Sequence, residues 1–99
     1  MNVTGDAGFA WDPDKRARNL REHGVDFADV PTVFDGPTLE YPDEAHSAGE
    51  ARVRAIGLLV GLEIAVIYTD VAEGVRHIIS ARRATPRERS AFYRAIGGR

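Results

Sequence analysis

The most informative part of the chain is residues 75–96, which read VRHIISARRATPRERSAFYRAI. From Val75 to Arg83, β-branched and apolar residues are interspersed with polar ones, as in a strand. Thr85 and Glu88 then form a capping box, with Pro86 at the first helical position. We therefore predict a strand followed by a helix that ends at the closing glycines.

Two more helices are predicted before this stretch. Asp12 and Pro13 suit the N-cap and the first position of a helix that ends at Gly24. A second helix runs from near Asp26 towards Phe34. Pro31 inside this segment removes a backbone donor. The helix is therefore predicted to be short, to be kinked, or to start later than Asp26.

The remaining segments alternate in the manner of strands and turns. Strands are predicted at 9–11, 38–41, 52–59 and 62–69, with a polar loop at 42–49. The predicted order is β-α-α-β-β-β-β-α, an α+β fold of helices packed on an antiparallel sheet. We expect residues 9–99 to form one domain after a flexible tail of residues 1–8.

Length and composition restrict the class of protein. The chain has 99 residues and no cysteine, which excludes disulfides and cysteine-bound zinc. The first ten residues lack the pattern of a signal peptide, and no apolar stretch approaches the roughly 20 residues of a membrane span, so a cytoplasmic protein is expected. The net charge is -2, whereas nucleic-acid binders are usually basic. However, residues 76–99 contain seven arginines and one acid, and such a segment can bind phosphate.

Strand parity gathers arginines on one face of the predicted sheet. In the strand at 62–69, alternate residues from Leu62 to Tyr68 are apolar and face the core. The opposite, outward face then collects four arginines, which are Arg52, Arg54, Arg76 and Arg82. Such a face suits phosphate or an acidic protein. The alternative is the ordinary polar solvent face of an antiparallel sheet.

The first helix and the polar loop carry candidates for proton transfer. Lys15, Asn19 and His23 recur at four-residue spacing and share one helix face. This stripe fits a phosphate-pairing ammonium, a positioning amide and a base; alternatively it is a solvated face with His23 at the helix C-terminal dipole. His46, in the loop, is a second candidate. The sequence contains no H-E-x-x-H or similar motif, so neither a metal nor a cofactor is expected.

Several segments together resemble the BrnT family of toxins. They are FAWD at 9–12, Lys15 with Asn19, HGV at 23–25 with Phe27, VFD at 33–35 with Pro37, HS at 46–47, GE at 49–50 with Arg52, IG at 56–57, IISARRA at 78–84 and the helix at 87–93. The resemblance implies a RelE-like fold and a ribonuclease that arrests translation. It also implies a BrnA-like, ribbon-helix-helix antitoxin made in the same operon, which assembles with the toxin and binds operator DNA to repress their promoter.

Two positions depart from the family pattern. Pro31 stands where the family usually has a helix former. His77 stands where the family commonly has arginine, and Arg76 is displaced from it by one residue. By parity this shift moves the charge to the other strand face.

RNA can be cleaved without a metal when its 2′-hydroxyl attacks the adjacent phosphodiester. Such a site needs a base, a proton donor for the leaving oxygen, and cations around the phosphorane. Arg82 is predicted to stabilise the transition-state charge, a histidine to act as base or acid, and Lys15 to assist electrostatically. The predicted catalytic residues are Arg82, His23, His46 and Lys15, and the predicted RNA contacts are Arg52, Arg54 and Arg76. The competing hypothesis is a non-enzymatic module whose arginine face binds an acidic protein partner.

Overall fold

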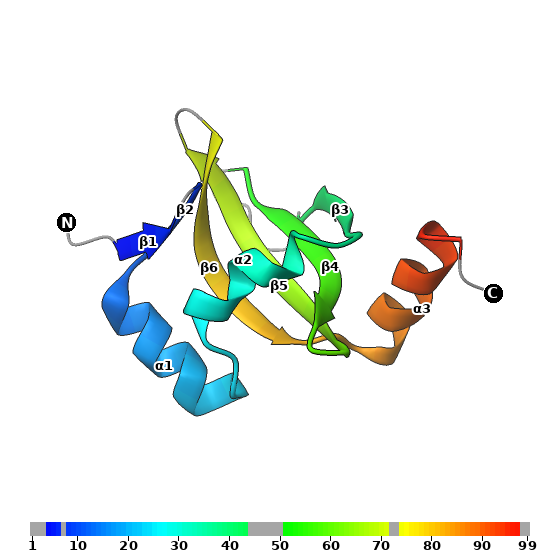
Figure 1. Ribbon diagram of the computed structural model, residues 1–99, viewed down its shortest axis with the longest axis horizontal. Helices are drawn as coiled ribbons and strands as arrows, with labels where there is room; N and C mark the ends of the chain where they lie inside the picture. The colour runs from blue at the N-terminus through cyan, green and yellow to red at the C-terminus, as the bar shows by residue number, and fades with distance from the viewer. Residues whose placement is uncertain (1–3, 7, 44–50, 72–73, 98–99) are drawn as a thin grey trace.

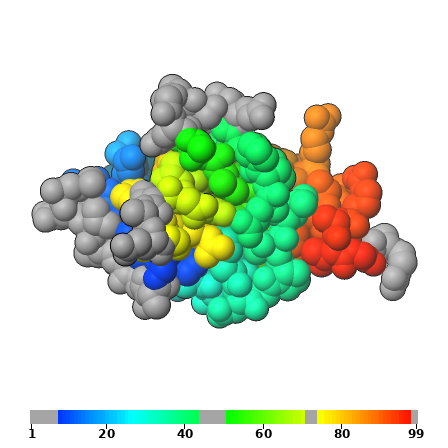
Figure 2. Space-filling model, turned by 90° about the horizontal axis from the view of Figure 1, so that it is seen from above, coloured from blue at the N-terminus to red at the C-terminus, as the bar shows by residue number. Residues whose placement is uncertain are grey.

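The computed structural model describes residues 4–6, 8–43, 51–71 and 74–97. Its elements are, in chain order, β1 (Thr4–Asp6), β2 (Phe9–Trp11), α1 (Pro13–His23), the 3-10 helix η1 (Phe27–Asp29), α2 (Val30–Val33), β3 (Leu39–Pro42), β4 (Val53–Leu59), β5 (Leu62–Val71), β6 (Val75–Arg83) and α3 (Pro86–Ala95). In Figure 1, α2 lies in front of a twisted sheet, α1 lies beside the sheet at the lower left, and α3 lies at one end of the long axis. Figure 2 gives the view from above, with α3 in orange and red at that end.

The described strands form one six-stranded sheet in the order β1-β2-β6-β5-β4-β3. All neighbours are antiparallel except β2 and β6, which run parallel. The prediction of an antiparallel sheet is therefore wrong at this pair, because β2 is joined to β6 only through the rest of the chain and its direction is not set by a hairpin. A further strand, Thr4–Asp6, lies within the segment for which a flexible tail was expected. The α+β class is confirmed.

Helix α1 begins and ends where its capping residues predict. The Asp12 side chain accepts from the Asp14 N–H at 2.8 Å, and the N–H of Gly24, at φ +73°, donates to the Leu20 carbonyl at 3.0 Å. Pro31 lies in the first turn of α2, where a missing N–H is tolerated, and α2 begins only after η1 and has four residues, so the predicted short helix with a late start is confirmed. Among the described residues, no helix has the length and apolar character needed to cross a membrane.

Apolar side chains pack on both faces of the sheet. On the face that we call the front, η1 and α2 cover a cluster that includes Trp11, Phe27 and Ile64. On the back face, α3 covers a smaller cluster that includes Ile56 and Phe92. The alternation of residues along the strands predicts that the back face of the sheet is open to solvent. This prediction is wrong for the part of the face that α3 covers. The apolar residues on α3 need burial, and the back of β4 provides it.

A β-bulge in β6 changes which residues share a face. Ile67 pairs with Ser80 but its neighbour Tyr68 pairs with Ile78, so Ile79 is an extra residue. Beyond the bulge, Ser80 and Arg82 face the back, as predicted. Before the bulge the parity reverses, and Ile78, predicted to face outward, is fully buried in the front cluster.

Candidate functional site

A hollow of about 310 Å³ on the back face gathers three of the predicted arginines. Arg54 lies on β4 with Arg52 just before it, and Arg82 lies on β6. Arg54 is the cross-strand neighbour of Ile67, which is in turn the neighbour of Ser80, so the three strands form the floor. The other lining residues are Asp43 and Ile79. We call this hollow the arginine pocket.

Two buried carboxylates hold Arg54 and Arg82 in this pocket. Glu88, 6% exposed, accepts from Nη1 of Arg54 at 2.8 Å and from Nη1 and Nη2 of Arg82 at 2.8 and 2.9 Å. Asp43 accepts from Nη2 of Arg54 at 2.5 Å. Because Glu88 is the third residue of α3, its carboxylate also accepts from the Thr85 N–H at 2.9 Å. One side chain thus caps α3 and fixes two guanidinium groups.

The carboxylate and guanidinium groups of the pocket shift one another's pKa values. Burial raises the pKa of Glu88, but the hydrogen bonds from Arg82 and the Thr85 N–H, with the charges of Arg82 and Arg54, outweigh it and bring that pKa to about 2. The hydrogen bonds to Glu88 raise the pKa of Arg82. Glu88 and Asp43 therefore hold Arg54 and Arg82 as charged groups in the hollow that Arg52 also lines.

A second hollow, of about 170 Å³, adjoins the arginine pocket and shares Ile79 and Ser80 with it. Its lining includes Lys15 and His23 from α1. The structure therefore places these two predicted residues in a hollow next to the one that Arg82 lines. We call this the helix hollow.

Asn19, between Lys15 and His23 in the predicted stripe, has a structural role. Its amide donates to the carbonyls of Val25 at 2.9 Å and Ala81 at 2.8 Å, and it accepts from the Ala81 N–H at 3.2 Å. Because β2 pairs with β6 only as far as Ile78, Asn19 takes the place of a strand neighbour further along this edge. It is 6% exposed and fully occupied, so it is not available to a substrate as a positioning amide.

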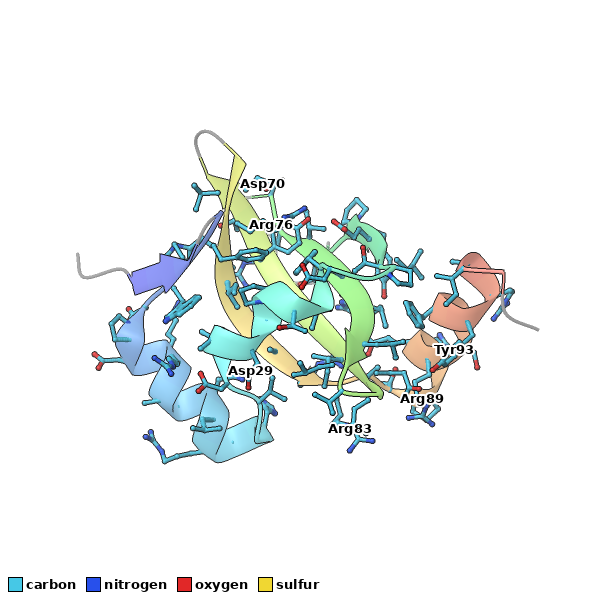
Figure 3. All side chains as sticks on the ribbon, in the orientation of Figure 1. Asp29, Asp70, Arg76, Arg83, Arg89 and Tyr93 are labelled. Carbon is cyan, nitrogen blue, oxygen red and sulfur yellow. The ribbon has the colours of Figure 1, made fainter. Side chains whose placement is uncertain are left out.

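Arg76 is not part of the arginine pocket, and the prediction that it shares a face with Arg52, Arg54 and Arg82 is wrong. The bulge turns it to the front, where its guanidinium carbon lies 4.5 Å from the ring centre of Phe34, 5.4 Å from that of Tyr68 and 5.6 Å from that of Phe9. Figure 3 shows Arg76 beside Asp70, at the opposite end of β6 from Arg83. Its place among aromatic rings identifies a packed cation.

His46 lies outside the described residues, so its role stays a prediction. Sequence reasoning did not identify Asp43 or Ser80 as pocket residues, and it identified Glu88 only as a helix cap. The capping box signals the position of Glu88 on α3, but no local pattern signals its pairing with Arg54, 34 residues away. Among the described residues, no group of three or more acidic or histidine side chains is arranged to hold a metal ion.

Comparison with protein families gives a match over residues 11–88 to the model of the ribonuclease toxin BrnT of type II toxin–antitoxin systems. The chain belongs to the BrnT family. The crystal structure of the Brucella abortus ribonuclease toxin BrnT matches with a TM-score of 0.61 and 35% identity, over 76% of this chain and 92% of that one. A search of curated proteins finds no match. The expected family is thus confirmed, and the BrnT match contains the whole arginine pocket and ends at Glu88.

Proposed function

We propose that this BrnT-family toxin cleaves RNA in the arginine pocket without a metal ion and so arrests translation. The observation that carries the proposal is the convergence of Arg52, Arg54 and Arg82 in one hollow, where Glu88 and Asp43 orient the guanidinium groups of Arg54 and Arg82. Guanidinium groups bind phosphate through paired N–H donors, and they can supply the charge stabilisation that a metal ion supplies elsewhere.

In the proposed reaction the 2′-oxygen of RNA attacks the adjacent phosphorus, and the bond from phosphorus to the 5′-oxygen breaks. A base takes the 2′-hydroxyl proton, and an acid protonates the departing 5′-oxygen. The products are a 2′,3′-cyclic phosphate and a 5′-hydroxyl. Arg82 and Arg54 stabilise the phosphorane charge, since Glu88 already orients both of them.

The proton-transfer groups are proposed from the adjoining helix hollow. His23 is exposed there, and Lys15 adds positive charge on the same helix. His46 remains the competing base or acid. Glu88 is excluded from this role, because a carboxyl group with a pKa of about 2 is a weak base and holds no proton to donate near neutral pH.

Type II membership gives the toxin an antitoxin partner. We propose a BrnA-like, ribbon-helix-helix antitoxin that forms a hetero-oligomer with the toxin in the cytoplasm and alone contacts operator DNA. The competing module that binds only an acidic protein predicts no cleavage of RNA by the purified chain.

The proposal is tested by incubating the purified toxin with end-labelled RNA in excess chelator. We expect cleavage to persist and the new ends to be a cyclic phosphate and a 5′-hydroxyl. Cleavage that stops in chelator and returns with a divalent ion would contradict the metal-free mechanism. No cleavage under either condition, by a folded chain that still binds its antitoxin, would favour the non-enzymatic module.

A further inference from the structure

The turn between β4 and β5 exposes an apolar residue in a strained conformation. Val60 is 93% exposed and has φ +49°, and Gly61 follows with φ +80°. Two positive φ values suit a two-residue hairpin turn, in which asparagine or aspartate normally precedes glycine. A β-branched residue is unfavourable there, and neither packing within the chain nor solubility explains a valine. Such an outlier calls for a functional reason.

A larger apolar hollow lies beside this turn. It has a volume of about 450 Å³, and its apolar walls come from the hairpin and from the segment after α1, with Val25, Leu59, Leu62 and Ile64 among the lining residues. Leu62 is 45% exposed. Val60 and Leu62 are two of the four large hydrophobic residues that are exposed within the described ranges. We call this hollow with its turn the hairpin groove.

The edges of the groove carry opposite charges. Asp29, at the end of η1, and Arg83, at the end of β6, both line it and are both exposed. Figure 3 shows the two on the side of the molecule below α2. An apolar floor between an acid and a base is complementary to a segment with apolar side chains flanked by charges of the reverse order.

We propose that the hairpin groove is the anchoring surface for the antitoxin, which inserts an apolar side chain between Val60, Leu62 and the groove floor. An antitoxin partner is expected because the chain belongs to the BrnT family of type II toxins. The proposal therefore rests on this family membership and not on the ribonuclease mechanism. The arginine pocket lacks such an anchor, because charged groups dominate its lining. A stable protein complex draws much of its affinity from a buried apolar centre.

The position of the groove also connects anchoring with inhibition. His23 lines both the hairpin groove and the helix hollow, and the helix hollow shares Ser80 with the arginine pocket. A segment anchored at the hairpin therefore covers one side of His23. Inhibition then needs no direct pairing with Arg54 or Arg82, which the toxin already pairs internally.

The test uses the full-length toxin and the purified product of the gene that adjoins its own. Val60→Asn with Leu62→Thr removes the apolar anchor, while asparagine suits the turn and threonine suits a strand, so the variant should fold at least as well. We expect its affinity for that product to fall by about tenfold or more, with unchanged cleavage of RNA by the free toxin. Asp29→Asn should weaken binding by a smaller factor.

The matched control is Ile96→Asn, which removes another exposed hydrophobic residue at the end of α3 and should leave the affinity unchanged. Unchanged affinity of the Val60→Asn, Leu62→Thr variant would overturn the proposal. The proposal would also be overturned if the free toxin were a dimer that this variant converts to a monomer without loss of antitoxin affinity. In that case the groove would hold a second copy of the toxin. Loss of RNA cleavage with intact antitoxin binding would assign the groove to substrate and also overturn it.

Discussion

The carboxylate of Glu88 is shared among three groups: the Thr85 N–H, Arg54 and Arg82. Each of these groups is a donor, and a carboxylate has acceptor sites enough for all of them. The pocket therefore depends on a side chain that need not touch the substrate. Its contribution is to fix two flexible arginines in advance, so less conformational entropy is lost when phosphate binds.

Substitution of Arg82 tests the arginine that we place at the transition state. Arg82→Ala should reduce the rate of RNA cleavage by about a hundredfold, because a guanidinium group is lost where charge develops. Its free energy of unfolding should fall by about 1–2 kcal/mol, since Glu88 is buried and keeps only Arg54 as a charged partner. Cleavage of end-labelled RNA and denaturant unfolding measure the two effects.

Arg87→Ala provides the control, because Arg87 is exposed on α3 and is not among the residues that line the arginine pocket. It should change the rate by less than about twofold and the stability by less than about 0.5 kcal/mol. Near-normal cleavage by a folded Arg82→Ala toxin would remove Arg82 from the site.

The sequence is sufficient to nominate Arg52, Arg54 and Arg82, because the alternation of a regular strand assigns each residue to a face. It is not sufficient to assign their partners. Glu88 and Asp43 reach Arg54 only after α3 and the end of β3 have packed against the same face. Such pairings follow from tertiary structure, which local patterns do not specify.

At the scale of elements, the bulge in β6 explains the error at Arg76. One extra residue, Ile79, reverses the parity of everything before it on the strand. Its flanking residues read as ordinary strand, so the alternation contains no mark of the insertion. The same bulge places Ile79 and Ser80 in both the arginine pocket and the helix hollow. The β-bulge, which cannot be recognised in the sequence, therefore connects the arginine pocket with the helix hollow.

The packing of α2 on β4 yields a stability prediction. A Cβ added at Gly57 would lie 2.6 Å from Cγ1 of Val33 and 3.1 Å from Cγ2 of Thr38. Both neighbours are β-branched and stiff, so Val33 cannot move aside without shifting α2, nor Thr38 without shifting the segment before β3. Gly57→Ala should therefore lower the free energy of unfolding by about 1–3 kcal/mol, as measured by urea denaturation.

Gly36→Ala is the matched control, because nothing lies within 4 Å of a Cβ built there and its φ is not positive. We expect a change within about 0.5 kcal/mol, or a slight gain from the reduced freedom of the unfolded chain. Equal effects of the two substitutions would show that α2 does not pack closely on β4.

At the scale of the whole molecule, two apolar clusters lie on opposite faces of one sheet. The front cluster is large and joins β2 and the segment after α1 to three further strands, β4, β5 and β6. The back cluster is smaller, and α3 contributes Phe92 to it. The ion pairs of Glu88 with Arg54 and Arg82 further stabilise the packing of α3 on the sheet. The integrity of the arginine pocket and the docking of α3 are therefore coupled.

Acid should weaken this coupling in a defined range of pH. Because the pKa of Glu88 is about 2 in the folded toxin and about 4.5 when unperturbed, its ion pairs contribute their full stability above about pH 4.5. That contribution is lost as the pH falls towards 2. Comparison with Glu88→Gln isolates the contribution of the Glu88 ion pairs to stability. The variant should be roughly 2–3 kcal/mol less stable than the unchanged toxin at neutral pH, and this difference in the free energy of unfolding should vanish near pH 2. Urea unfolding of both proteins across this range measures the difference, which a constant value at every pH would contradict. The largest loss of amide-exchange protection in acid, measured relative to the intrinsic exchange rate at each pH, should occur in α3, since the front cluster does not depend on this carboxylate.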